Sequence, residues 1–497
     1  MSEVTRRELL RRGAVLGAGV ALAGPTLLRP TAADAAKPRI VVVGAGLAGM
    51  TAAWRIHKRT GWDVQVFEAA HSVGGRTCSI RGLDGGQIAE GGAQGVNTND
   101  KALKSLIKEL GLQLKDTWAN WPTGGGTFYF DGAVRTREES RAGIKKAYRA
   151  AEKQFSQLPW PLTYANATPA ARMWDRMSVA EWIDRYAPGG LNSVLGRYIT
   201  NYFEILYAGP VQEASAIHII ADYGWSGWGP DANYNERYWV DGGNMSVTEE
   251  IASRLPAGAV HTRMPLLALR IKPSGEKICT FDDGGTPVDV VADRVILAMP
   301  FPALRNVDLS KAGLSTLKMR TIRRSAIGNN TKENFQFTSD PWSVNGNGSS
   351  YSDLEPGWTW QASSHQPGTE HLITGMNGAL WGGDYGGIWY HTSAPVPGGV
   401  ATQYLTALGT VFGGVDAAGA YNGNGYIHNW PANPWVQGSY SYYKTGRWTE
   451  IAGAEDIPER GIHFAGEHTA PYVMRGYMNG AVMTGKRAAK EVLHALA

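Results

Sequence analysis

The fold of this chain is decided by the stretch Arg39-Ile40-Val41-Val42-Val43, which runs directly into Gly44-Ala45-Gly46-Leu47-Ala48-Gly49. After Arg39, residues 40–43 form a continuous, β-branched apolar run, which is typical of a buried parallel strand. Residues 50–58 are predicted to be helical, and a second strand is predicted over residues 63–67. Strand, glycine-rich turn, helix and strand in this order indicate a dinucleotide-binding βαβ unit.

Each glycine of the turn has a physical task. Gly44 permits the tight turn, Gly46 lets the backbone approach a pyrophosphate, and Gly49 lets helix and strand pack closely. The free N–H groups at the start of the helix face the phosphates. Glu68 ends the second strand 19 residues after Gly49, where a carboxylate accepts hydrogen bonds from a ribose diol. The predicted cofactor-binding residues here are Gly44, Ala45, Gly46, Leu47, Ala48, Gly49 and Glu68.

Composition excludes several classes of protein. The 497 residues correspond to about three domains. A net charge of +4 is too near neutral for a protein that tracks nucleic-acid phosphates. The two cysteines, Cys78 and Cys279, make neither a disulfide framework nor a four-thiolate metal site. We expect both thiols to be free and buried, and we predict no metal site.

The first 35 residues have the layout of an export signal. Paired arginines (Arg6-Arg7) precede a weakly apolar run over residues 13–24, and Ala33-Asp34-Ala35 supplies small residues for cleavage. The run is too short to cross a bilayer, which needs about 20 apolar residues. We therefore expect export of the folded protein to the periplasm or the outside of the cell, without stable membrane insertion.

Two loops beyond Glu68 carry a family resemblance. They read His71-Ser72-Val73-Gly74-Gly75-Arg76-Thr77 and Glu90-Gly91-Gly92-Ala93-Gln94. The first resembles the FAD-binding pattern of the flavin amine oxidase superfamily, and the second resembles the loop that passes over the flavin ring in that family. The resemblance implies cofactor contacts from Gly75, Arg76, Gly91, Gly92 and Ala93, and a substrate contact from Gln94.

The C-terminal region strengthens the resemblance. The stretches 461–469, which contains Gly466-Glu467-His468, and 475–482, which contains Tyr477-Met478, look like the final FAD segment of monoamine and polyamine oxidases. The resemblance places Gly466 and Glu467 by the ribityl or phosphate region and the backbone of Met478 by the flavin ring. A helix that begins there stabilises the negative charge of reduced flavin through its unpaired N–H groups.

The expected fold class is α/β, with a discontinuous Rossmann-like FAD-binding domain and an α+β substrate-binding domain whose mixed sheet is flanked by helices. Strands are predicted at residues 265–270 and 293–300, and the resemblance brings the backbone of Leu266 to the adenine. Ser178 and Ser246 each open a Ser-x-x-Glu capping box. Residues 135–157 and 178–206 read as helical, and residues 320–445 as strand-like. The predicted segments are an export signal (1–35), FAD-binding parts (36–118, 236–319 and 446–497) and substrate-domain parts (119–235 and 320–445).

The resemblance also names residues of the reaction site. Lys332 matches the family lysine that holds a water at flavin N5, and Tyr440 and Tyr477 match two tyrosines that flank the substrate amine. Trp435 lies in the same segment as Tyr440 and is expected to contact substrate. Ser439 stands where monoamine oxidases attach FAD through a cysteine, so we expect noncovalent FAD.

The sequence therefore predicts an FAD-dependent oxidase that converts a small amine to an imine and reduces molecular oxygen to hydrogen peroxide. An L-amino acid oxidase is the alternative, although the arginine that follows the flavin loop in such enzymes is missing after Gln94; Arg475 or Arg447 would have to replace it. A FAD-binding protein without turnover and a flavin monooxygenase stay open as well. A homodimer is an open alternative to a monomer.

Overall fold

The computed structural model of the protein describes residues 26–28, 37–225, 235–378 and 396–497. The paired arginines, the apolar run and the cleavage residues of the predicted export signal lie outside these ranges. Strand β1 (Thr26–Leu28) lies inside the predicted signal and pairs in parallel with β13 (Thr286–Ala292). Within the described residues, no helix combines the length and apolar character that crossing a membrane requires.

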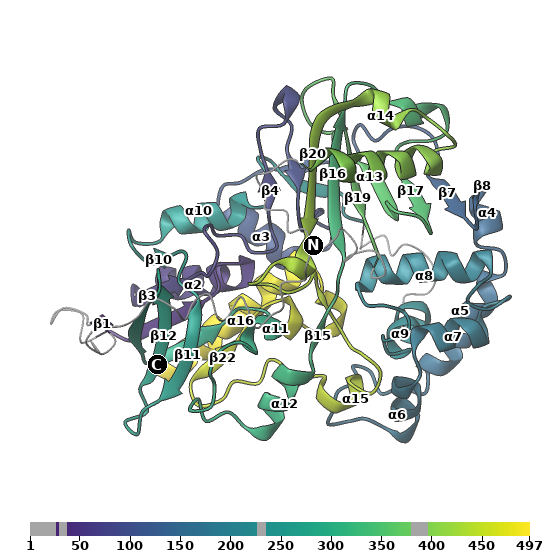
Figure 1. Ribbon diagram of the computed structural model, residues 1–497. Coiled ribbons are helices and arrows are strands. Elements are labelled where there is room, and N and C mark those ends of the chain that lie inside the picture. The colour runs from purple at the N-terminus through teal and green to yellow at the C-terminus, as the bar shows by residue number, and fades with distance from the viewer. Residues whose placement is uncertain (1–25, 29–36, 226–234, 379–395) are drawn as a thin grey trace, which may run out of the picture.

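A five-stranded parallel sheet carries the predicted βαβ unit (Figure 1). Its order is β10 (Val260–His261), β3 (Asp63–Phe67), β2 (Arg39–Val43), β14 (Arg294–Leu297) and β22 (Ile462–Phe464). These strands come from all three segments that the sequence assigns to FAD binding. The α/β fold class is thus confirmed, while the domain limits themselves stay a prediction.

Both faces of this sheet are buried, as its β-branched strands require. Along β2, Ile40 and Val42 pack against helices, whereas Val41 and Val43 pack against a second sheet. The helices are α2 (Leu47–Thr60), α3 (Lys101–Glu109), α10 (Ser246–Arg254) and α16 (Met478–Leu496). The second sheet contains β11 (Leu266–Ile271), β12 (Lys277–Asp283), β13 (Thr286–Ala292) and β1.

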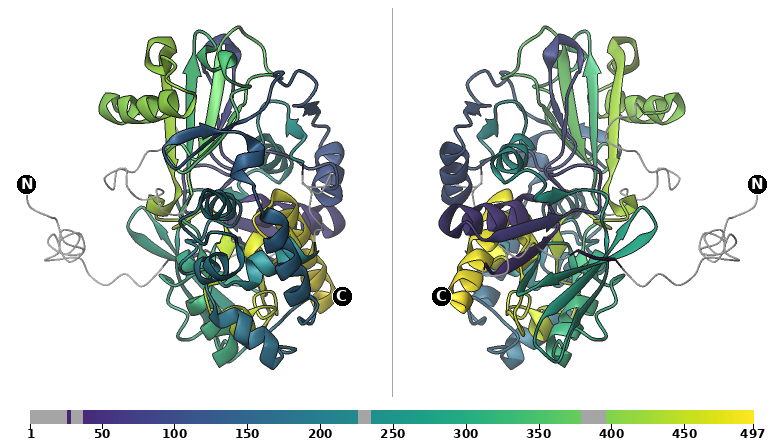
Figure 2. Two further views of the ribbon diagram at one scale, coloured as in Figure 1. Left: turned by 90° about the vertical axis from the view of Figure 1, so that its right-hand side faces the viewer. Right: turned by 90° about the vertical axis from the view of Figure 1, so that its left-hand side faces the viewer.

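Helices α2 and α16 bring the two ends of the described chain together. They lie side by side, in purple and yellow, in both side views of Figure 2. Gly49 is enclosed where α2 meets the glycine turn, because a Cβ placed there would lie 1.9 Å from the carbonyl oxygen of Gly44. Any larger residue at position 49 would push the helix away from the turn.

A seven-stranded mixed sheet forms the other large layer. Its order is β20 (Tyr421–Asn429), β16 (Thr331–Phe337), β19 (His371–Met376), β18 (Trp358–Gln361), β17 (Ser350–Ser352), β7 (Thr127–Phe130) and β8 (Ala133–Arg135). Helix α13 (Gly398–Val411) covers one face, where Tyr404 stacks on Phe335 with ring centroids 4.2 Å apart. The prediction that residues 320–445 are all strand-like was wrong for this helix, whose two opening glycines weaken the helical pattern.

Helices α4 to α9 form the remaining lobe, on the right of Figure 1. They are α4 (Arg137–Ser140), α5 (Ile144–Phe155), α6 (Pro169–Arg176), α7 (Val179–Tyr186), α8 (Val194–Tyr207) and α9 (Ile217–Trp225). The predicted helical stretches 135–157 and 178–206 are therefore each broken once. Gly143 causes the first break with its positive φ of 83°, and the Pro188-Gly189-Gly190 turn causes the second.

One of the two predicted capping boxes is confirmed. Ser178 accepts from the backbone N–H of Glu181, whose carboxylate accepts in return from the N–H of Ser178. The prediction for Ser246 was wrong. Helix α10 begins at Ser246 itself, and the Ser246 hydroxyl donates backwards to the carbonyl oxygen of Gly242. That bond closes the preceding turn instead of capping the helix.

Candidate active site

One large cavity of about 1720 Å³ runs between the parallel sheet, the seven-stranded sheet and the helical lobe. Ligand pockets for drug-sized molecules measure about 300–1,000 Å³, so this cavity has room for a dinucleotide and a substrate together. Most of the predicted site residues line it. They are Gly44, Gly46, Leu47, Ala48, Glu68, Gly75, Arg76, Gly92, Ala93, Gln94, Leu266, Lys332, Trp435, Tyr440, Gly466, Glu467, Tyr477 and Met478.

Three predicted residues stay behind the cavity wall. Ala45 donates its backbone N–H to Glu68, and Gly49 packs on Gly44 as described above. Gly91 is buried against His428, since a Cβ at position 91 would lie 2.5 Å from the imidazole ring. These residues shape the loops and leave the cavity surface to their neighbours.

The nucleotide end is built around Glu68. Its carboxylate accepts from the N–H of Ala45 at 2.7 Å and from the N–H of Ala70 at 2.8 Å. Burial raises the pKa of Glu68, and the backbone donors oppose that rise. Leu266 begins β11 beside Met264 and Pro265, which line the same part of the wall. The acid thus ties the glycine turn to the end of the second strand.

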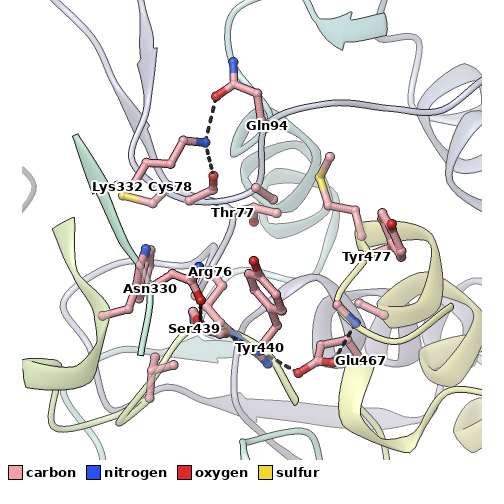
Figure 3. A pocket seen from close by; sticks show the side chains of 18 of the residues that line it. Arg76, Thr77, Cys78, Gln94, Asn330, Lys332, Ser439, Tyr440, Glu467 and Tyr477 are labelled. Carbon is pink, nitrogen blue, oxygen red and sulfur yellow. Dashed lines mark hydrogen bonds and ion pairs between the residues drawn. The ribbon is translucent and has the colours of Figure 1, made fainter. Parts of the chain in front are cut away.

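An ion pair joins the predicted FAD loop over residues 71–77 to the C-terminal FAD segment. Arg76 donates to Glu467 at 2.7 Å and to the carbonyl oxygen of Ser439 at 2.8 Å (Figure 3). Glu467 also accepts from the Ser441 hydroxyl at 2.7 Å and from the N–H of Gly476 at 2.9 Å. Burial disfavours the charged Glu467, but Arg76 and these donors outweigh it and lower the pKa of Glu467 to about 2.

Lys332 is the second residue of β16 and reaches the cavity from the start of that strand. Its ammonium donates to the carbonyl oxygen of Gly92 and to the side-chain oxygen of Gln94, both at 2.8 Å (Figure 3). It also lies 4.9 Å from the ring centroid of Trp360. Burial lowers the pKa of Lys332 to about 8, although Glu236, Glu90 and Glu333 favour the charged form. The lysine is therefore an ammonium at neutral pH and loses its proton in mildly alkaline solution.

Aromatic side chains surround the space in front of Lys332. Tyr440 is partly buried and lines the cavity, and its hydroxyl donates to the carbonyl oxygen of Ile205. Figure 3 shows the Tyr440 ring rising into the same space that Lys332 and Tyr477 border. Tyr477 directly precedes helix α16. Trp435 is 41% exposed and lies at the rim of the cavity.

The remaining predicted features have structural partners. The Ser439 hydroxyl donates to Asn330 at 3.1 Å, and both cysteines are free and buried, as expected. Arg475 pairs with Glu455 at 2.8 Å, and Arg447 pairs with Glu450 at 2.7 Å. Arg475 also lines the cavity, whereas Arg447 does not, so Arg447 is not placed to clamp a substrate carboxylate.

The sequence did not reveal several polar residues of the cavity. Asp222, Glu236 and Arg141 line it, together with tyrosines at positions 148, 198, 202, 207, 223, 351 and 472. Most of them lie on or beside helices of the lobe, whereas Tyr351 lies on β17 and Tyr472 lies between the stretches 461–469 and 475–482. Only folding brings them to the cavity, so no spacing in the sequence could have found them.

The residues present fit FAD. The glycine turn leaves the start of α2 open, since a Cβ at Gly46 would meet its nearest neighbour, the carbonyl oxygen of Gly74, only at 3.8 Å. A helix N-terminus and a buried carboxylate are what a pyrophosphate and a ribose require. The sequence profile described as flavin-containing amine oxidoreductase matches residues 47–493. The chain belongs to the flavin-containing amine oxidoreductase family.

Individual relatives agree with this assignment. An L-amino acid dehydrogenase of Synechocystis is 25% identical over 91% of this chain and 94% of its own length. Bovine flavin-containing amine oxidase B is 25% identical over 92% of this chain and 86% of its own. The structure of cyclohexylamine oxidase from Brevibacterium oxydans shares the fold, with a TM-score of 0.78, 20% identity and coverage of 93% and 99% of the two chains. This chain is therefore an FAD-dependent amine oxidoreductase.

Proposed function

We propose that the protein oxidises a small amine to an imine, which hydrolyses to an aldehyde or ketone and releases ammonia or an amine, while O₂ is reduced to H₂O₂. The observation that carries the proposal is the position of Lys332. It shares one cavity with the glycine turn and with Tyr440 and Tyr477, and it is held by the loop that carries Gly92. The residues proposed to bind the nucleotide and those proposed to bind the amine thus line one cavity.

Bound FAD would supply the two-electron acceptor, so the protein's own groups have other tasks. Tyr440 and Tyr477 both line the cavity near Lys332, where their ring faces would orient the amine. Lys332 holds a proton at its Nζ atom and fixes the Gly92 and Gln94 oxygens. The first turn of α16 directs unpaired N–H groups at the site, which favours negative charge there.

An L-amino acid oxidase is the second candidate, and Arg141 favours it. Arg141 lines the cavity and donates to the hydroxyl of Tyr148 at 3.0 Å, while its buried Nε has no hydrogen-bond partner among the described residues. A guanidinium in this position can pair with a substrate carboxylate. Relatives such as the L-amino acid dehydrogenase of Synechocystis support keeping this candidate.

Anaerobic titration of the yellow protein tests both candidates. Monoamines, diamines and L-amino acids are added in turn, and loss of the visible flavin absorbance is followed. Bleaching by amines with peroxide formation on admitting air is expected. Bleaching by α-amino acids alone would favour the second candidate, and a flavin band that no compound bleaches would leave only a FAD-binding protein without turnover.

We also propose that residues 1–35 direct export of the folded protein. Support comes from the order of the paired arginines, the apolar run and the small residues. Replacing Arg6 and Arg7 together by lysine should retain the precursor inside the cell. Unchanged export of that variant would contradict a twin-arginine route.

A further inference from the structure

Glu90 is a buried carboxylate behind the wall of the cavity, and the proposed chemistry does not use it. It ends strand β5 (Ala89–Glu90) and is 1% exposed. That strand pairs with β4 (Ser79–Ile80), which places Ser79 opposite Glu90. Just beyond Glu90, residues 92–94 reach the cavity surface. A carboxylate in such a place is unfavourable unless hydrogen-bond donors or cations meet it.

Three donors meet this carboxylate. Its Oε1 atom accepts from the indole N–H of Trp239 at 2.7 Å and from the backbone N–H of Asn244 at 2.8 Å. Its Oε2 atom accepts from the hydroxyl of Ser79 at 2.9 Å. The turn before Asn244 fits closely here, since a Cβ at Gly243 would lie 2.5 Å from the Ser79 hydroxyl oxygen. Neither N–H group can accept a hydrogen bond, so both favour the ionised form of Glu90.

Two cations of the described chain, Lys332 and Arg81, interact electrostatically with Glu90. Burial raises the pKa of Glu90 to about 7, while the donors and Lys332 favour its charged form. Arg81 pairs with Glu249 at 2.8 Å. The nearby thiol of Cys78 stays protonated, because burial raises the pKa of Cys78 to about 12. Above pH 7 Glu90 is therefore an anion that favours the ammonium form of Lys332.

Two further carboxylates, those of Glu236 and Glu333, also favour the ammonium of Lys332. Glu333 follows Lys332 on β16 and therefore points to the other face of the sheet. Glu236 lines the cavity. Glu90 differs from both because it belongs to the loop whose Gly92 oxygen accepts from Lys332. The charge of Glu90 and its place in that loop thus act on the same lysine.

Asn244 fastens the same loop to the turn that follows β9 (Tyr238–Val240). Its side-chain amide donates to the carbonyl oxygens of Ala93 at 2.9 Å and Gln94 at 2.8 Å. Its backbone N–H donates to Glu90, and the residue is completely buried. A buried network in which every donor has an acceptor holds one geometry. Asn244 therefore fixes the backbone of the loop next to Gly92.

Strand β16 holds the loop at two further points. Asn334 donates to the carbonyl oxygen of Glu90 at 3.2 Å, and Lys332 donates to that of Gly92 at 2.8 Å. Because Lys332 and Asn334 are two residues apart on the strand, both side chains point to the same face. A shift of the loop at Asn244 would therefore move the oxygens that Lys332 binds.

We propose that Glu90 and Asn244 are positioning residues for Lys332. Asn244 fixes the loop so that the Gly92 and Gln94 oxygens meet the Lys332 ammonium. Glu90 anchors Asn244 and supplies a buried negative charge that attracts that ammonium. The inference rests on the proposed function, because both residues act on the amine reaction through Lys332.

Glu90→Gln tests the charge. Glutamine has almost the same shape and keeps an acceptor for Trp239 and Asn244, but it is neutral. In the FAD-loaded enzyme, the step at which Lys332 loses its proton should move to lower pH by about one unit, because a carboxylate that favours the ammonium is missing. The limiting rate of flavin reduction by the best amine, measured from pH 7 to 10.5, reports this step.

A measurement without turnover follows the same step. The free energy of unfolding is compared between Lys332→Met and the protein that keeps Lys332, once with Glu90 and once with Glu90→Gln. In each pair, raising the pH relieves the cost of the buried ammonium. The relief should begin about one pH unit lower in the pair that carries Glu90→Gln.

Asn244→Ala tests the loop. It removes both amide donors and leaves the backbone N–H that Glu90 accepts. We expect the limiting rate of flavin reduction to fall by about 10- to 100-fold, since a displacement of about 1 Å can cost about 10²-fold. The amine concentration for half-maximal rate should stay within about threefold of wild type, because Asn244 does not line the cavity. The pH step of Lys332 should stay at its wild-type position.

Asp175→Asn is the matched control. Asp175 on α6 is a fully buried carboxylate that accepts from the backbone N–H and the hydroxyl of Thr449, both at 2.8 Å, and it does not line the cavity. Its replacement should lower stability but leave the limiting rate within about twofold of wild type and the Lys332 step in place. If Glu90→Gln does not fold, Ser79→Ala, which removes one donor to the carboxylate, should move the Lys332 step in the same direction by a smaller amount.

Three results would overturn the inference while leaving the proposed function intact. The first is a Lys332 step that stays at its wild-type pH in Glu90→Gln. The second is a limiting rate in Asn244→Ala within about threefold of wild type. The third is an equal loss of rate in Asp175→Asn, which would reduce the effects to lost stability. Failure of every amine to bleach the flavin would instead contradict the proposed function, so the two failures are distinguishable.

Discussion

Replacing Lys332 by methionine separates a role in the reaction from a role in folding. Methionine has a similar length, fills the same space and removes only the charge and the donors. If Lys332 holds a proton or a water for the reaction, we expect kcat/KM to fall by about 10²- to 10⁴-fold, the range typical of a positioned acid–base group. The measurements are the rate of anaerobic flavin reduction and the rate of peroxide production.

The effect on stability can be worked from the site. Burial lowers the pKa of Lys332 from 10.5 to about 8, so keeping the ammonium charged at pH 7 costs the folded state roughly 3 kcal/mol. Methionine removes that cost. It also leaves the oxygens of Gly92 and Gln94 without the hydrogen-bond donor of Lys332, which costs the folded state about 1–3 kcal/mol for each oxygen. These effects oppose each other, so the free energy of unfolding should change by less than about 3 kcal/mol.

The sign of the pH dependence follows from the lowered pKa. The cost of the charged lysine is present below pH 8 and disappears as the pH rises from 8 toward 10.5. The wild-type protein should therefore gain stability relative to Lys332→Met over this interval. Chemical denaturation at pH 7, 8, 9 and 10 measures the difference.

Lys318 provides a matched control. It is also buried, burial lowers its pKa to about 8, and its ammonium donates to the carbonyl oxygens of Ala454 and Glu455 at 2.6 and 2.9 Å. It does not line the cavity. Lys318→Met should therefore change stability to a similar extent and leave kcat/KM within about threefold. The reasoning is refuted if Lys332→Met keeps more than a tenth of the wild-type reduction rate, or if Lys318→Met loses as much activity.

Three further changes test the cofactor end of the cavity. Glu467→Gln should weaken FAD binding by about 10- to 100-fold, because it removes the ion pair with Arg76. The folded pKa of Glu467 is about 2, so the stability that its charge contributes is present above pH 4.5 and lost as the pH falls to 2. The free energy of unfolding of the variant should therefore vary less with pH over that interval, and an unchanged pH dependence would count against the ion pair. Gly49→Ala should lower the free energy of unfolding by about 3 kcal/mol or more, because the alanine methyl group would lie 1.9 Å from the Gly44 oxygen. Thermal melts of the apoprotein measure this loss. A melting temperature within a degree of wild type would contradict the enclosure of position 49 between helix α2 and the glycine turn. Ser439 offers no thiolate, so acid precipitation should leave all FAD in the supernatant, and yellow colour in the pellet would disprove noncovalent binding.

The sequence by itself determined the parallel sheet and its glycine turn. From Ile40 to Val43, strand β2 alternates between two buried faces. These four positions therefore have to be apolar, which makes the strand visible in the sequence as the run 40–43. The turn is equally visible, because only glycine fits at position 49 against the Gly44 oxygen. Local constraints of this kind act within about 30 residues, so they can be recognised in the amino-acid sequence alone.

Local rules failed where several signals competed. Ser246 opens a Ser-x-x-Glu pattern, yet it is the first residue of the helix and not the residue before it, and its hydroxyl donates to the carbonyl oxygen of Gly242 in the preceding turn. Helix α13 escaped notice because it begins with two glycines, although burial of Tyr404 against Phe335 stabilises it. In both cases contacts outside the local pattern decided the outcome.

Only the tertiary structure decided which polar groups share the cavity. Lys332 meets Gly92, which lies 240 residues earlier in the chain, and Arg76 meets Glu467 across 391 residues. The family resemblance had named these four residues without giving their partners. Asp222 belongs to no motif, and only the fold places it on the cavity wall beside the tyrosines of α8 and of the C-terminal loop. A carboxylate on a helix reads as a solvated charge until the fold removes it from water.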